Sequence, residues 1–195
     1  MIELIAALLF LPCAAAAAMP GYNWMPANEI YLTAPLKQTI IYSEGGISPY
    51  ADTLGLGYRL AGDGQGVTKT AAVQLQRLTV SNNILGLSGT FSLLELLGGA
   101  EYSFPAESKK RLRWTASALA DLGLGGNTVF MAPVLTAGLL YRANPAAAGP
   151  GGTTFTVYYR FTDITLHSAL GQSVTLRPAL GFRLGYLFSS FWRPR

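Results

Sequence analysis

The chain has 195 residues, which fits one domain and excludes two large, separately packed cores. Charged residues make up only 12% of it and its mean hydropathy is +0.31, so it is more apolar than most soluble domains. Its 22 glycines are unusual for a helical membrane protein, whereas turns and interior-facing positions of a β-barrel would use them. The net charge of +4 is spread along the chain, and the single basic cluster at 109–111 gives no support for nucleic-acid binding.

Residues 1–18 have the features of a cleavable signal peptide. Leu4 to Ala18 is a continuous apolar stretch that ends in an alanine run, as signal peptidase requires, although Glu3 takes the place of the usual basic residue. An uncleaved anchor helix is the alternative, but about 15 apolar residues are short for a span. Cys13, the only cysteine, follows Pro12, which disfavours lipidation. Because Cys13 lies within the predicted leader, the exported chain would hold no cysteine and no disulfide.

Residues 19–28 form an irregular segment, and the region 29–192 then divides into short runs with the alternation of β-strands. In a strand, successive side chains point to opposite faces. Near Gln76–Arg77 the apolar phase changes, which predicts a bulge or a misread strand. After Leu93 the period is lost, and a short helix over 94–97 is an alternative. The predicted strands are 29–43, 53–60, 67–81, 85–93 with a possible extension to 104, 111–123, 129–141, 155–161 and 174–188.

The last predicted strand has the clearest pattern of the chain. One face would hold only apolar residues, namely Val174, Leu176, Pro178, Leu180, Phe182, Leu184, Tyr186 and Phe188. The other face would hold Thr175, Arg177, Ala179, Gly181, Arg183, Gly185 and Leu187. This run is longer than most soluble strands and long enough for a tilted strand to cross a bilayer.

The stretch 111–141 is also strongly patterned. Leu112, Trp114 and the alanines that follow them alternate with polar residues up to Gly123. Between Asp121 and Arg142 lie 20 uncharged residues, so a transmembrane helix is an alternative here. Gly125-Gly126-Asn127 and Pro133 favour two strands joined by a turn instead.

Together these patterns predict an all-β fold, an antiparallel up-and-down transmembrane β-barrel of about eight strands. A soluble β-sandwich or lipocalin-like barrel is the alternative, but its closed core could not desolvate five arginines. A water-containing lumen could hold them with Asp121 as the inward acid. The predicted lumen charge network is Arg59, Arg113, Asp121, Arg160, Arg177 and Arg183. The aromatic residues predicted to form a membrane girdle are Tyr58, Trp114, Tyr141, Phe155, Tyr186 and Phe188.

From about Glu29 to Trp192 this architecture resembles the small eight-stranded outer-membrane barrels of the OmpA/OmpX type. The resemblance implies a bacterial outer-membrane location, contact with outer-membrane lipid, and a terminal strand read by the barrel-assembly machinery. Leu184, Tyr186 and Phe188 match that assembly signal, although the chain continues to Arg195. A second departure is that the longer connections, 98–110 and 142–153, fall on the side where the family has short turns.

Motifs for chemistry are few. His167-Ser168 is similar to the His-x-Ser pair of outer-membrane lipid A deacylases, but the two residues are adjacent and no acid follows Asp163. The expected function is a structural or interaction role with a filled lumen; a narrow anion-leaning pore and a lipid-modifying enzyme are the alternatives. The sequence predicts a monomer without cofactor, metal or nucleic-acid partner, and it leaves enzymatic activity open.

Overall fold

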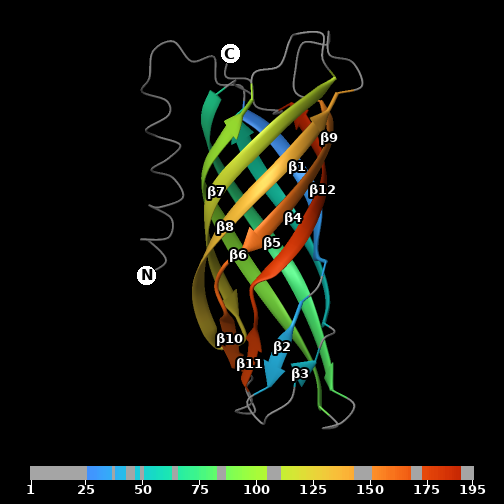
Figure 1. The fold of residues 1–195 in the computed structure, drawn as a ribbon, viewed down its shortest axis with the longest axis vertical. Coiled ribbons are helices and arrows are strands. Elements are labelled where there is room, and N and C mark those ends of the chain that lie inside the picture. Colours follow the sequence, from blue (N-terminus) through green and yellow to red (C-terminus); the bar gives the residue numbers. More distant parts are fainter. Residues whose placement is uncertain are drawn as a thin grey trace.

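The computed structural model describes residues 26–36, 38–42, 47–48, 51–62, 66–82, 87–104, 111–142, 151–167 and 173–189. Eight strands close into an antiparallel barrel (Figure 1). They are β1 (Pro26–Pro35), β4 (Ala51–Gly62), β5 (Gly66–Asn82), β6 (Leu87–Ser103), β7 (Leu112–Gly125), β8 (Thr128–Tyr141), β9 (Gly152–Arg160) and β12 (Ala179–Ser189). The barrel closes where β1 pairs with β12, so the predicted architecture and strand number are confirmed.

Four short strands form a second sheet at the lower end of the barrel in Figure 1, here called the cap sheet. They are β2 (Ile40–Tyr42), β3 (Ile47–Ser48), β10 (Ile164–His167) and β11 (Ser173–Leu176). Their order, β10-β11-β2-β3, repeats that of the barrel strands β9-β12-β1-β4 to which the chain connects them. The cap sheet is therefore a continuation of half of the barrel wall beyond a break in each strand.

The outer surface of the barrel is apolar over most of its height. Exposed large apolar side chains from β1, β4, β5, β6, β7, β8, β9 and β12 form this surface, here called the belt: Ile30, Leu32, Leu54, Leu56, Tyr58, Leu60, Val67, Val73, Leu75, Tyr102, Leu112, Trp114, Leu124, Val129, Met131, Leu135, Tyr141, Phe155, Tyr159, Leu180, Leu184 and Tyr186. The residues between them on each strand point inward. Soluble proteins do not expose an apolar surface of this extent, so the soluble alternative is wrong.

Beyond the belt the outward face of the wall becomes polar and the inward face becomes apolar. β5 and β6 are the longest strands, with 17 residues each, and they stay paired in one continuous register from Gly66–Ser103 to Asn82–Leu87. Residues 77–82 and 87–92, here called the β5–β6 arm, extend past the end of β7 at Gly125. In this arm Leu78 and Val80 point inward and are buried, whereas Thr79 and Thr90 are exposed. The phase change near Gln76–Arg77 therefore marks the edge of the belt, and the predicted bulge is wrong.

The cap sheet packs across the arm and closes this end of the barrel. The shared core contains residues from β2, β5, β6, β10 and β11, with Phe91 and Phe130 packed against it: Ile40, Leu78, Val80, Leu93, Ile164, Leu166, Val174 and Leu176. Every one of these eight side chains is at most 4% exposed. The end of the molecule is thus a small two-layered β structure with a dry core.

Three sequence-based expectations are corrected by this arrangement. Residues 94–97 belong to β6, and residues 121–141 form parts of β7 and β8 joined by a turn, so both helix alternatives are wrong. No helix that could span a membrane occurs in the described ranges. The predicted strand 174–188 is divided at Arg177–Pro178: β12 keeps the predicted faces, but Val174 and Leu176 lie in the cap core. The chain bends here because the proline cannot continue the ladder.

The bounds of the first strand also differ from those predicted. β1 begins at Pro26, inside the segment 19–28, and ends at Pro35, after which the chain enters the cap sheet. The signal peptide predicted over 1–18 and the lipidation question at Cys13 lie outside the described residues. The predicted connections 98–110 and 142–153 are too long, because β6 continues to Ser103 and β9 begins at Gly152. The strands that flank them place both at the end where β1 begins and β12 ends, as the strand count predicts.

Candidate functional site: the barrel interior

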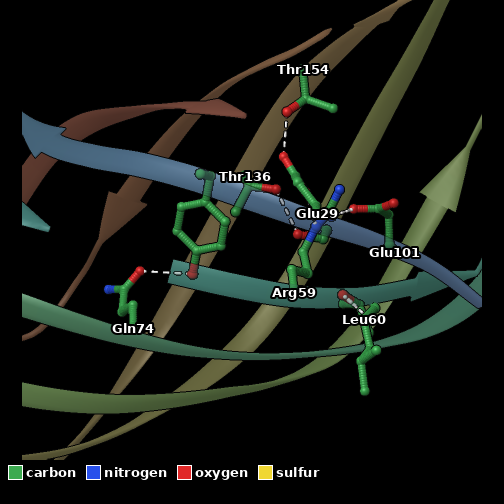
Figure 2. Close-up of polar contacts among 10 residues, drawn as sticks. Glu29, Arg59, Leu60, Gln74, Glu101, Thr136 and Thr154 are labelled. Carbon is green, nitrogen blue, oxygen red and sulfur yellow. Dashed lines mark hydrogen bonds and ion pairs between the residues drawn. The ribbon is translucent and has the colours of Figure 1, made fainter. Parts of the chain in front are cut away.

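The first polar cluster of the interior is built around Arg59 on β4. Figure 2 shows its guanidinium between the carboxylates of Glu29 on β1 and Glu101 on β6. The hydroxyl of Thr154 on β9 donates to the other oxygen of Glu29. Nearby, the hydroxyls of Ser117 and Thr136 are 2.5 Å apart. The cluster therefore links strands on several sides of the barrel through buried charge pairs.

The second polar cluster lies toward the cap and is built around Glu95 on β6. One oxygen of Glu95 accepts from Gln74 and the other is 3.3 Å from Nη1 of Arg160. The Arg160 Nη2 donates to Gln38 Oε1 at 3.4 Å, and Gln38 in turn donates to the backbone oxygen of Arg177 at 2.8 Å. This chain of contacts connects the middle of the barrel to the junction with the cap sheet.

Arg183 on β12 lies between these clusters, sandwiched by two tyrosines. Its guanidinium carbon is 5.1 Å from the ring centroid of Tyr31 and 5.0 Å from that of Tyr158, distances at which cation–π attraction operates. Both rings lie close over a glycine, because a Cβ at Gly57 would overlap the Tyr31 ring and one at Gly181 would overlap Tyr158. The glycines on the interior face thus make room for the rings.

The predicted network is brought together only in part. Arg59, Arg113, Asp121, Arg160 and Arg183 lie in the interior, where Arg113 lines a cavity together with Arg59. Arg177 does not: its side chain is 51% exposed and its Nη1 is 2.7 Å from the Asp163 carboxylate. The reason is the break at Arg177–Pro178, which places Arg177 at the barrel–cap junction, outside the lumen.

Sequence reasoning missed three of the four interior acids. Glu29, Glu95 and Glu101 are buried in the interior beside Asp121. Glu29 and Glu101 carried a usable signal, because their neighbours Ile30 and Tyr102 fit the outward phase. The interior of the described strands therefore holds four acids against four arginines, and Asp121 is not the centre of the pairing. Asp121 is 2% exposed, and one of its oxygens lacks a hydrogen-bond partner among the described residues.

Apolar and aromatic side chains pack between and beyond the polar clusters. Ala27, Leu140 and Leu187 pack together near the end where β1 begins. A middle layer consists of Tyr31, Ala72, Leu97, Leu119, Val134 and Tyr158. The cap core closes the other end. A cavity of about 20 Å³ beside Arg59, Glu101 and Arg113 has room for about one water molecule.

His167, of the His167-Ser168 pair, is not part of an acid–base constellation in the described structure. His167 is exposed at the end of β10, where its backbone oxygen accepts from Asn127 and its amide donates to the hydroxyl of Thr128. Ser168 lies outside the described residues. Within the described ranges no group of three or more potential metal ligands occurs. Of the proposed assembly signal, Leu184 and Tyr186 are 50% and 58% exposed on the belt and Phe188 is half-buried.

The fold is that of the small outer-membrane β-barrels. The outer membrane protein OprG from Pseudomonas aeruginosa superimposes with a TM-score of 0.56 at 8% identity, over 86% of this chain and 95% of that one. Neisserial surface protein A gives a TM-score of 0.43 at 12% identity, over 82% and 96% of the two chains. The attachment invasion locus protein Ail of Yersinia pestis gives 0.43 at 14% identity, over 86% and 100%. No protein-family model matches the sequence, and a search of curated proteins finds no match.

Proposed function

We propose that the protein is a bacterial outer-membrane β-barrel with a structural or interaction role and a lumen closed by its own side chains. The observation that carries this proposal is the cap core, whose eight buried apolar residues span the end of the barrel. The apolar belt supports a membrane-spanning position, because its outward faces match the lipid-facing stripes of transmembrane barrels. The chain would be exported with the leader 1–18 removed, and would meet outer-membrane lipid and the assembly machinery, the latter through Leu184, Tyr186 and Phe188.

The cap end would face the cell exterior. Outer-membrane barrels carry short periplasmic turns and longer extracellular connections. Here the connections that contain secondary structure of their own, β2–β3 and β10–β11, are on the cap end together with the β5–β6 arm. Any partner would therefore meet an ordered β surface rather than a channel mouth.

The two alternatives have less support. An anion-leaning pore needs uncompensated interior cations, but the described strands place four buried acids among their four interior arginines. A lipid-modifying enzyme needs an oriented acid beside its histidine. Among the described residues, His167 at the exposed cap edge bonds through its backbone, to the amide of Asn127 and the hydroxyl of Thr128.

Planar-bilayer recording tests the proposal. The refolded protein, verified as an inserted and heat-modifiable species, should give no stable channel because the apolar layers exclude a continuous water path. Large, steady and anion-selective conductance from the unmodified protein would overturn the closed lumen and favour the pore.

A further inference from the structure

We propose that the outer face of the β5–β6 arm binds the phosphorylated saccharide headgroup of lipid in the surrounding leaflet, with Arg77 as the phosphate ligand. This inference rests on the proposed function, since it requires the cap end to face the outer leaflet. It deepens that proposal by naming a lipid partner and the residues that contact it.

The first argument is the level of Arg77 relative to the belt. Leu75 and Leu94 are the last apolar outward pair of β5 and β6, and Arg77 and Ser92 are the next outward pair in the same register. One outward step along a strand is about 7 Å, of which a barrel strand tilted by about 40° gains roughly 5 Å along the membrane normal. The polar headgroup region is about 5–7 Å thick on each side of the hydrocarbon core, so Arg77 lies at headgroup level.

The second argument is the chemistry of the surrounding face. Ser92, Thr79 and Thr90 are exposed around Arg77, and Thr79 is the direct cross-strand partner of Thr90. A guanidinium binds phosphate oxygens through two parallel hydrogen bonds, and neighbouring hydroxyls can donate to and accept from sugar hydroxyls. Leu54, the partner of Arg77 on β4, offers apolar surface to the arginine stem.

The third argument is the contrast with the other exposed cations of the wall. Arg177 at the same end is already paired with Asp163 at 2.7 Å. Lys69 also points outward from β5, but its neighbours on that face are Val67, Ala71 and Ala100. Arg77 is therefore the exposed cation that combines headgroup level with a hydroxyl-rich surrounding. The acidic residue nearest to it in register is Asp52, whose backbone pairs with Thr79.

Native mass spectrometry of the detergent-solubilised protein, incubated with lipid A or with its dephosphorylated form, tests this assignment. The unmodified protein should retain lipid A over the dephosphorylated lipid. Arg77→Gln should lower lipid A retention by about tenfold, because the charge-assisted hydrogen bond to the phosphate is lost. Arg177→Gln is the matched control and should leave retention unchanged.

Each opposite result overturns the inference. Equal retention of the two lipids removes the phosphate requirement, and equal losses in Arg77→Gln and Arg177→Gln indicate unspecific attraction. Displacement of lipid A by an equal concentration of soluble glucosamine phosphate would assign the site to a soluble ligand. Insertion of all variants into phosphatidylcholine vesicles as heat-modifiable species shows separately whether the barrel itself is correctly described.

Discussion

Glu29 is the side chain that holds the closing seam of the barrel from inside. It projects from β1, pairs with Arg59 on β4 and accepts from Thr154 on β9. It also passes close over Gly185 on β12, where a Cβ would collide with its carboxylate. One carboxylate therefore joins the first strand to strands on both sides of the seam. Because the pairing is buried, each member depends on the others to offset the loss of its hydration.

Glu29→Gln should weaken the barrel strongly. It leaves Arg59 with Glu101 as its remaining carboxylate partner, and breaking a buried pair costs about 3 kcal/mol at the lower end of the observed range. Urea unfolding of the protein in vesicles, followed by tryptophan fluorescence, measures the loss. Asp163→Asn is the control, because its exposed pair with Arg177 should contribute less than about 1 kcal/mol. Equal losses in the two variants would remove the buried network from this account.

Gly57→Ala and Gly181→Ala should each destabilise the protein, because the added methyl would overlap a buried tyrosine ring. Overpacking of this kind typically costs about 1–3 kcal/mol. Gly98→Ala is the matched control on β6, since a Cβ there meets no atom within 4 Å. Thermal unfolding on semi-denaturing gels compares the three; a loss in Gly98→Ala as large as in Gly57→Ala would contradict the close ring–glycine contacts.

β5 shows how one continuous strand passes through two environments. Up to Gln76 its inward side chains are small or polar and its outward ones, Lys69 apart, are apolar; from Arg77 onward the assignment is reversed. The backbone register with β6 does not shift at this point. The inversion is therefore a response to the surroundings, because lipid outside requires apolar residues outside, whereas water outside requires them inside.

A charge scan along the outward face of β5 tests this inversion. Leu75→Arg places a cation on the belt, and a buried charge of this type costs about 2–4 kcal/mol near the bilayer midplane and less toward its edge. Thr79→Arg, two outward steps further along the same face, should be tolerated because that position is beyond the belt. Folding yield into vesicles is the measurement. Similar yields for both variants would mean that the belt does not end between these residues.

The alternation of single strands could be predicted from the sequence. The inward and outward faces of β7, β9 and β12 are those that the dyad pattern indicates, since lipid-facing and interior residues differ sharply there. The faces of β6 are harder to predict from the sequence, because leucines occupy both faces around Glu95 and hide its inward position. The pattern alone is misleading at two sites. At Gln76–Arg77 the surroundings of the strand change while its register with β6 continues, and at Arg177–Pro178 the strand itself is interrupted.

The cap sheet could not be predicted. Its strands have two to four residues, too few to show a period, and they pair across long separations such as Val174 with Tyr42. The interior pairing was inaccessible for the same reason: Arg59 meets Glu101 across 42 positions of the chain. Only closure of the barrel brings such residues together, and that information is not contained in the local pattern.

The whole molecule combines an apolar outer wall with an interior into which the described strands direct charged, aromatic and aliphatic side chains. Two polar clusters alternate along the axis with apolar layers, and the cap core closes the end that we assign to the cell exterior. Under the proposed function, a molecule built in this way would present an ordered β surface above the membrane. On β5 the belt ends between Leu75 and Thr79, while the same sheet continues into water.

Lipid quenching tests that claim most directly. Cys13 is the only cysteine and lies in the predicted leader, so single cysteines can be placed in the exported chain without competition. A fluorophore attached at position 73, 75, 79 or 90 is compared in vesicles of brominated and ordinary phosphatidylcholine. Strong quenching at 73 and 75 with little at 79 and 90 is the predicted result. Uniform quenching at all four positions, or none at any of them, would contradict the account.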